Sequence, residues 1–430
     1  MPACGLGVGV VWWPPLDALC RPGEGLIDVI EAEPEAFWIP APSGDGFRSL
    51  LADALSHLPQ PKLLHGVGAP VGGTCPPPRG HAAAFARDVA ALHPPFVSEH
   101  LSFRLFRERP GGPAVAAGFL LPPLQSERGM RMAVDNIHER RAALGSIPLA
   151  VETPVSYLPP APGEWPDGAF IAAVAEAADC GILLDLHNVL CNARNGRQSV
   201  AAFCAALPPE RVWELHLAGG ERESGFHLDA HAGLVEPELW EIAAGLVPRL
   251  SQLQAIVFEI MPERIADIGL APIGKHLGRM RELWNRRAQD ATADLPRRAP
   301  AGTLPLVPET WEMLLGCAFN GRALPPLDGA TAAWWHAAAP SVALYRTLVG
   351  EGRASAVSAA APRTVRLLLA HGGEAAARGM LAAFWHQSPP GYTAAEEARA
   401  LFRFLAATHP ALPGLAEAMA SDAAVLDEVG

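Results

Sequence analysis

The sequence lacks the cysteine patterns of zinc knuckles, thioredoxin-type redox sites and disulfide-rich domains. Its seven cysteines are an odd number, and no two of them form a CxxC pair. Zinc knuckles and thioredoxin-type sites need such pairs, and a complete disulfide framework needs an even number. We therefore expect reduced thiols, as in a cytoplasmic protein.

Positive charge is also scarce. The chain has 33 Lys and Arg against 45 Asp and Glu, so its formal net charge is −12, and no basic stripe interleaved with aromatic residues offsets this. Nonspecific binding to nucleic acid relies on Lys and Arg that displace counterions from phosphates. Residues 1–15 have no basic segment, and glycine and proline break their apolar stretch, which argues against a signal peptide or a membrane span. We expect a cytoplasmic protein with no nucleic-acid or membrane partner.

The length and the pattern of the chain predict two domains. At 430 residues the chain is longer than one ordinary core, and half of its residues are hydrophobic. Residues 286–308 contain four prolines and little periodicity, which is typical of a linker. We therefore expect a first domain over residues 1–285 and a second over residues 309–430, where the periodicity is helical throughout.

Eight short apolar runs alternate with helical patterns in the first 260 residues. This alternation predicts an α/β fold, specifically a TIM-like (β/α)8 barrel, followed by a C-terminal all-α domain. The expected strands are Gly5–Val11, Leu26–Ile30, Lys62–Leu64, Pro95–Ser98, Pro148–Val151, Gly181–Leu184, Val212–Leu215 and Ala255–Phe258. The expected helices are Gly80–Leu92, Ser126–Leu144, Asp167–Ala178, Ser199–Leu207 and Glu236–Leu250.

Six of the eight strands are followed by a histidine or an acid, and the carboxyl ends of parallel strands meet at one mouth of a barrel. Asn188 follows one strand by a few residues, and Asp229 and His231 share a face if their segment is extended. Glycines flank His227 and His231, which makes a helical pairing of these two doubtful, and His187 is expected to be structural. The candidate ligands at the mouth are His65, His100, Glu152, Asp185, Asn188, His216, Asp229, His231 and Glu259.

Each of these residues alone has an ordinary structural explanation; a histidine, for example, can serve only as a hydrogen-bond partner of a loop. Together they indicate a metal site, because a buried carboxylate must be paired, protonated or bound to a cation. Nitrogen and oxygen ligands without thiolate suit non-haem iron or manganese, and zinc also fits. Nine ligands exceed what one ion can use, so we expect two or three ions that share bridging carboxylates.

Several segments, taken together, resemble a family of multinuclear non-haem iron-dependent oxidative enzymes, formerly an uncharacterised conserved bacterial family. The similar segments are LLHGVGAPVGG, FVSEHLSF, LAVETPVSYL, ADCGILLDLHNVLCNARNGR, VWELHLAGG, LDAHAGLVEPELW and IVFEI, and they span nearly all of residues 1–285. The resemblance implies a TIM-like barrel that holds two or three irons, as Fe(II) and Fe(III), and uses O₂. It further implies oxidation of a residue, usually cysteine, in a ribosomally made precursor peptide.

The resemblance assigns metal ligation to all nine candidate residues, with Glu152 as the bridging carboxylate and Glu152 and Asp185 as catalytic groups. The sequence departs from the commoner family pattern at three places. Many members have HLAGH and DTHDHPV where this chain has HLAGG and DAHAGLV, so Gly220, Ala232 and Gly233 contribute no ligating side chain. The common LEN is VET here, with Thr153 as its last residue.

The helical domain resembles the small partner protein that such oxidases often need. The resemblance implies a natural fusion in which the precursor peptide is the partner and a separate partner protein is unnecessary. Two other functions remain open. One is a barrel of the sugar-isomerase or type IV endonuclease kind, which uses divalent metal without O₂. The other is a non-catalytic scaffold that binds metal or peptide.

Overall fold

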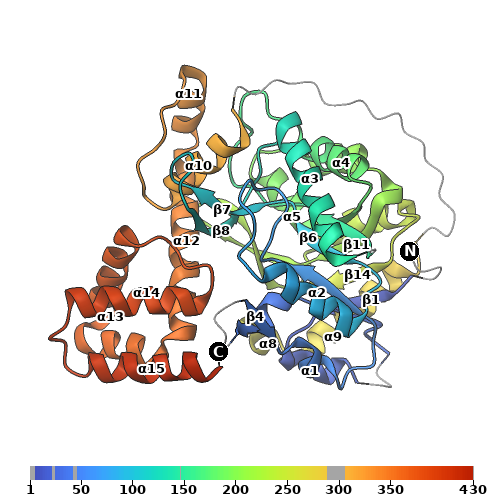
Figure 1. Cartoon of the computed structure of the whole chain (residues 1–430). Coiled ribbons are helices and arrows are strands. Elements are labelled where there is room, and N and C mark those ends of the chain that lie inside the picture. Colours follow the sequence, from blue (N-terminus) through green and yellow to red (C-terminus); the bar gives the residue numbers. More distant parts are fainter. Residues whose placement is uncertain (1–4, 22–24, 42–45, 146, 288–305, 430) are drawn as a thin grey trace.

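The computed structural model describes residues 5–21, 25–41, 46–145, 147–287 and 306–429. Most of the expected linker, residues 288–305, lies outside the described residues, as does Cys4. The chain forms a barrel surrounded by helices, and a group of further helices lies beside it (Figure 1).

Eight parallel strands close into a barrel in the order β1-β14-β11-β10-β9-β6-β5-β2, which confirms the predicted fold class. The strands are β1 Gly7–Val11, β2 Val29–Ala32, β5 Lys62–Gly66, β6 Val97–His100, β9 Leu149–Glu152, β10 Gly181–Asp185, β11 Val212–Leu217 and β14 Ala255–Phe258. Every strand overlaps an expected run. The second strand, Val29–Ala32, ends two residues after the expected run Leu26–Ile30, because it continues through the polar residue Glu31.

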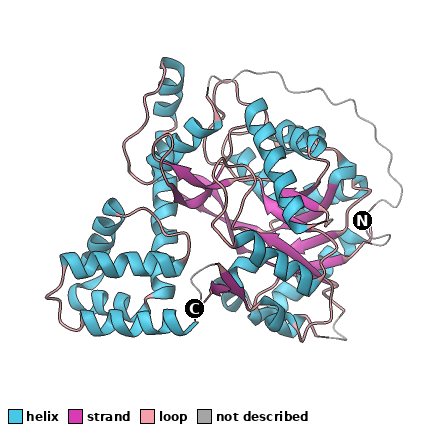
Figure 2. Ribbon diagram, viewed as in Figure 1, coloured by secondary structure: helices cyan, strands magenta, loops and turns pink. Residues whose placement is uncertain are grey.

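Helices cover the outside of the barrel, and all five expected helices are present (Figure 2). The helices of this region are α1 Leu51–Leu55, α2 His81–Leu92, α3 Glu127–Leu144, α4 Asp167–Ala177, α5 Leu186–Arg194, α6 Val200–Ala206, α7 Pro237–Leu246, α8 Pro262–Ile268 and α9 Leu270–Trp284. Side-chain caps set several starts. Ser126 accepts a hydrogen bond from the backbone of Gly129 at the start of α3, and Asp185 caps α5.

Three antiparallel hairpins extend from the barrel and were not expected from the sequence. They are β3 Trp38–Pro40 with β4 Phe47–Ser49, β7 Phe103–Arg107 with β8 Ala114–Leu121, and β12 Gly219–Glu223 with β13 Phe226–Gly233. The segment with Asp229 and His231 belongs to a strand, β13, but it is not extended throughout. The register shifts between the paired residues Leu228 and Gly233, and His231 has a φ of 43°, outside the extended region. Strained backbone of this kind is typical of functional sites.

The described residues after 306 form helices and no strands, as expected. The helices are α10 Pro308–Phe319, α11 Gly329–Ala337, α12 Ala339–Ala360, α13 Pro362–Gln387, α14 Ala394–Thr408 and α15 Leu415–Val429. Helices α13, α14 and α15 pack with the end of α12 around their own core, which contains Phe384 and Leu401. Figure 1 shows this bundle at the lower left, beside the barrel.

The beginning of the helical region shares a core with the barrel's loops. Trp311 of α10 and Tyr345 of α12 lie in one hydrophobic cluster with Phe103 of β7 and with Tyr157, which follows β9. The ring centroids of Tyr157 and Tyr345 are 5.3 Å apart. Helices α10 and α12 are therefore packed against the barrel rather than joined to it only through residues 286–308.

Hydrogen bonds connect this helical region to loops at the barrel mouth. Glu312 of α10 accepts a hydrogen bond from the backbone of Thr74, at 2.7 Å, in the loop after β5. The backbone of Tyr157 donates to the Tyr345 hydroxyl at 3.2 Å, and the Tyr157 hydroxyl in turn accepts from the backbone of Asp229 at 3.1 Å. The helical region thus contacts the loops that follow β5 and β9, the strands that carry His65 and Glu152.

The cysteines of the described residues form no disulfides with one another. The six free cysteines are Cys20, Cys75, Cys180, Cys191, Cys204 and Cys317. No described helix has the length and the apolar character that a membrane crossing requires.

The burial of Glu312 predicts a pH-dependent stability. Burial raises the pKa of Glu312 to about 8, so between its unfolded pKa and pH 8 the folded chain keeps a proton that the unfolded chain releases. Stability should therefore fall as the pH rises through this range. Glu312→Gln removes this loss, so the variant should gain about 2–4 kcal/mol over the wild type at pH 8, and much less at pH 5.

Thermal unfolding of both proteins at pH 5 and pH 8 measures this difference. Glu417→Gln, an exposed position on α15, is the control and should show no such pH dependence. An equal effect of Glu312→Gln at both pH values would contradict the assignment.

Candidate metal centre

Six of the nine candidate ligands lie at the carboxyl ends of barrel strands. His65 is on β5, His100 ends β6 and Glu152 ends β9, and the register pairs His100 with Glu152. Asp185 and His216 are likewise paired on β10 and β11, and Glu259 directly follows β14. Because neighbouring parallel strands end at the same mouth, residues far apart in sequence meet there.

The other three candidates reach the same mouth from adjoining segments. Asn188 lies in the first turn of α5, where its backbone donates to the Asp185 carboxylate at 2.7 Å. Its side-chain amide donates to the carbonyl of Thr153 at 3.2 Å, and its Oδ1 is buried without a hydrogen-bond partner. Asp229 and His231 come from the irregular part of β13. The structure therefore brings all nine residues to one region.

The first group of donor atoms comprises His65, His100 and Glu152, which lie within 4.8 Å of one another. Glu152 Oε2 is 2.8 Å from Nε2 of His100 and 3.2 Å from Nε2 of His65. Nevertheless this oxygen has no partner in hydrogen-bond geometry. An oxygen and two nitrogens that approach so closely without hydrogen bonds are arranged to face a common point, as ligands of one cation are.

The protonation of His100 supports the same arrangement. Its Nδ1 is 3.0 Å from the carbonyl oxygen of Gly66, and a carbonyl can only accept, so Nδ1 carries the hydrogen. In a neutral ring, Nε2 then presents a lone pair toward the Glu152 carboxylate. Burial by itself lowers the pKa of His100, but Glu152 outweighs it and raises this pKa to about 10. The contact therefore requires either a proton or a cation.

A second and a third group continue from the first. Glu152, Asp185 and His216 form the second, and Asp185, His231 and Glu259 form the third. His216 Nδ1 is 4.0 Å from Asp185 and 3.0 Å from Glu259, and Asp185 Oδ2 is buried without a hydrogen-bond partner. Because Glu152 and Asp185 each belong to two groups, the three sets form one continuous chain of donors.

Asp229 stands beside the third group. Its Oδ1 is 2.6 Å from Nε2 of His231, and neither atom has a hydrogen-bond partner in the described residues. This repeats the arrangement of Glu152 with His100. Burial first, and then the Asp229 and Glu152 carboxylates, raise the pKa of Asp185 well above its usual range. Such crowding of like charges is costly unless cations lie between them.

The donor chain is completely buried in its middle and partly exposed at both ends. The side chains of His216 and Asp185 are completely buried, whereas those of His231 and Asp229 are each 14% exposed and that of His100 is 16% exposed. A small molecule or a peptide side chain can therefore approach the centre from the side of β13 and β6.

The described residues also settle the positions of neighbours with uncertain roles. His187 is buried, with its Nε2 3.4 Å from the Leu228 carbonyl, and it belongs to none of the donor groups. A side chain on Gly220 would start 2.5 Å from this ring, so the missing side chain at position 220 makes room for His187. Glu99 does not orient the His100 ring; its carboxylate accepts from Arg140 at 2.8 Å.

Sequence reasoning missed two carboxylates in the barrel. Glu31 of β2 and Glu214 of β11 form a fourth donor group with His216. Glu31 directly follows the expected strand Leu26–Ile30, so the rule that found the other acids applied to it and was not used there. Glu214 lies inside an apolar run, and an acid within a strand that is otherwise apolar was the signal that would have found it.

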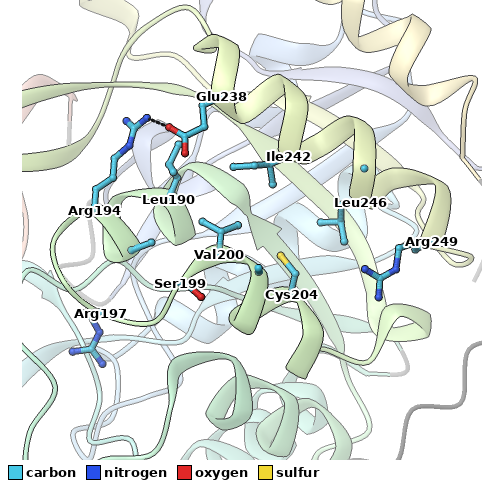
Figure 3. Close-up of a pocket in the computed structure, with 13 residues that line it drawn as sticks. Leu190, Arg194, Arg197, Ser199, Val200, Cys204, Glu238, Ile242, Leu246 and Arg249 are labelled. Atoms are coloured by element: carbon cyan, nitrogen blue, oxygen red, sulfur yellow. Dashed lines mark hydrogen bonds and ion pairs between the residues drawn. The ribbon is translucent and has the colours of Figure 1, made fainter.

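The cavities of the described residues lie beside the donor chain rather than over it. A cavity of about 620 Å³ lies outside the barrel between α5, α6 and α7, with Leu190, Ile242 and Cys204 among its lining residues (Figure 3). None of the nine candidate ligands lines it. A second cavity of about 510 Å³ adjoins the β12–β13 hairpin and is lined by His187 and Gly220.

Comparisons with known proteins agree on a family. Residues 7–263 match the family described as RiPP precursor modification enzyme MbnB/TglH/ChrH, where RiPP denotes a ribosomally synthesised and post-translationally modified peptide. A UPF0276 protein of Chromobacterium violaceum is 30% identical over 233 residues, which are 54% of this chain and 82% of that protein. A UPF0276 protein of an Anaeromyxobacter species is 32% identical over 234 residues, covering 54% and 78% of the two chains.

Solved structures show only distant similarity. A D-psicose 3-epimerase in the presence of D-fructose aligns with a TM-score of 0.38 at 12% identity, over 65% of this chain and 96% of that one. An L-ribulose 3-epimerase aligns with a TM-score of 0.35 at 12% identity, over 66% and 92%. At this level the similarity carries no argument about function, and the barrel is established by its own strand order.

The contact between His65 and Ser98 yields a prediction about metal affinity. Ser98 is buried, and its hydroxyl lies 2.9 Å from Nδ1 of His65, so it orients the ring whose Nε2 faces Glu152. Ser98→Ala should weaken the binding of a divalent ion about 10–100-fold, as the loss of a ligand's orienting partner commonly does. Anaerobic titration of metal-free protein with Fe(II) measures this affinity.

The control for Ser98→Ala is Ser341→Ala, which changes a buried serine of α12 and should leave the affinity unchanged. Equal affinity of Ser98→Ala and the wild type would contradict the role of Ser98 in orienting His65.

Proposed function

Since the chain belongs to the family of RiPP precursor modification enzymes MbnB/TglH/ChrH, we propose that it is a multinuclear, iron- and O₂-dependent oxidase. Its proposed substrate is a residue, cysteine in the first place, of a ribosomally synthesised precursor peptide. The nine residues at the barrel mouth are the proposed metal ligands, and the helical region is proposed to recruit the peptide.

One observation carries the proposal of a metal centre. The Glu152 oxygen lies close to two imidazole nitrogens and makes no hydrogen bond with either. Asp229 and His231 repeat this at the other end of the donor chain. Buried acceptors that face one another without a proton are unfavourable, and a cation between them removes the penalty.

The donor types favour iron over the softer metals. All donors in the four groups are carboxylates or imidazoles, and none is a thiolate. This set suits non-haem iron or manganese. When bound, iron supplies one-electron chemistry with O₂ and lowers the pKa of a thiol that coordinates it. Two shared carboxylates, Glu152 and Asp185, suit two or three neighbouring ions.

The chain's own residues divide the remaining work. Ser98 and the Gly66 carbonyl orient His65 and His100, and Asp185 holds Asn188 through the cap of α5. The middle of the site, around Asp185 and His216, is buried and excludes water, which strengthens every charge interaction there. The exposed edges of His100, Asp229 and His231 leave a side from which a peptide can approach.

The substitution Glu152→Gln tests the proposed activity. The substitution keeps the shape of the side chain but removes the charge of a carboxylate that belongs to two donor groups. Turnover should therefore fall at least about 100-fold, because the loss of a residue that only orients a ligand already costs about 10–100-fold. The assay follows O₂ uptake and the mass change of a cysteine-containing precursor peptide encoded beside the gene. Glu127→Gln, an exposed glutamate of α3, should retain full activity.

Other results would favour the alternatives. Wild-type protein that carries only stoichiometric zinc and consumes no O₂ would contradict the oxidase and favour a divalent-metal barrel of another kind. Wild-type protein that binds the peptide but converts none of it, with Glu152→Gln binding equally well, would instead indicate a scaffold.

A further inference from the structure

Two buried glutamates that are not among the nine candidate ligands lie on strands of the barrel. The register pairs Glu31 of β2 with Leu63, two residues before His65, and pairs Glu214 of β11 with Leu183, two residues before Asp185. Leu63 and Leu183 belong to the apolar cluster that fills this level of the barrel. Both glutamates are 0% exposed. Carboxylates at an apolar level are costly, so their presence calls for a specific interaction.

Glu31 makes that interaction with His216. Strands β2 and β11 are not neighbours in the barrel, so the contact crosses its interior. Glu31 Oε2 is 2.7 Å from Nε2 of His216, in hydrogen-bond geometry. The ring's other nitrogen, Nδ1, is in hydrogen-bond geometry with Glu259 at 3.0 Å and lies 4.0 Å from Asp185, on the side of the donor chain.

We propose that Glu31 is a positioning residue of the metal centre, a role that rests on the proposed function. A neutral imidazole carries one hydrogen, and a carboxylate at Nε2 holds it there. With a hydrogen held at Nε2, Nδ1 can give its lone pair to a cation shared with Asp185 and Glu259, in place of the hydrogen bond to Glu259, and the contact with Glu31 restrains the rotation of the ring. A carboxylate behind a ligating histidine also makes the ring a stronger donor.

Glu214 differs from Glu31 in its contact with the histidine, which makes it a matched control. Its nearest oxygen is 3.9 Å from Nε2 of His216, and both of its carboxylate oxygens are buried without hydrogen-bond partners. It is as deeply buried as Glu31 and lies near the same nitrogen, but it does not hold the ring. Effects of Glu31 that Glu214 does not reproduce therefore report on positioning.

The experiment compares Glu31→Met, Glu31→Gln and Glu214→Gln in the full chain. Anaerobic titration with Fe(II) alone gives the affinity and the number of ions, and NMR of protein with ¹⁵N-labelled histidine gives the tautomer of His216. Glu31→Met should weaken Fe(II) binding about 10–100-fold and lose the Nε2–H tautomer. Glu31→Gln retains an acceptor, so it should keep the tautomer and bind Fe(II) with intermediate affinity. Glu214→Gln should keep the tautomer and change affinity less than about 3-fold.

Three outcomes would overturn the inference. The first is an unchanged His216 tautomer in Glu31→Met, and the second is an equal loss of Fe(II) affinity in Glu31→Met and Glu214→Gln. The third is that Glu31→Met and Glu214→Gln each bind one ion fewer than the wild type. The last would identify Glu31, Glu214 and His216 as ligands of an ion of their own. Wild-type protein that binds no Fe(II) would instead refute the proposed function, and circular dichroism of each variant separates these results from misfolding.

Discussion

The candidate metal centre is defined by buried carboxylate oxygens that face imidazole nitrogens without hydrogen bonds between them. Glu152 with His100 and Asp229 with His231 are the clearest pairs, at 2.8 and 2.6 Å. A closed parallel barrel can hold such contacts because each strand fixes its last side chain against those of its neighbours. Without a proton or a cation between them, the lone pairs of these atoms would repel one another. Cations between them are the simplest physical reason for a fold to retain this arrangement.

Much of this arrangement could be predicted from the sequence. A histidine or an acid that directly follows an apolar run, as His65 and Glu152 do, becomes a residue at the barrel mouth once the runs form one barrel. The β12–β13 hairpin and the contacts of Glu31 could not be predicted in this way. They depend on pairing between distant segments, and a glutamate inside a strand interrupts the apolar pattern that is used to find the strand.

The helical region is more closely integrated with the barrel than a separate domain joined by a linker. Its first helices bury Trp311 and Tyr345 against barrel loops, and hydrogen bonds lead from Tyr345 through Tyr157 to the backbone of Asp229. Only α13–α15 and the end of α12 have a core of their own. The fused helices therefore support the loops that surround the candidate metal centre, in addition to any part they take in recruiting a peptide.

Anomalous diffraction at the iron edge, from crystals of protein reconstituted anaerobically with Fe(II), tests the central claim most directly. The account predicts two or three iron peaks at the barrel mouth, one of them between Glu152 Oε2 and the Nε2 atoms of His65 and His100. Iron found only elsewhere on the molecule, or a mouth in which these side chains contact one another with no iron peak between them, would contradict it.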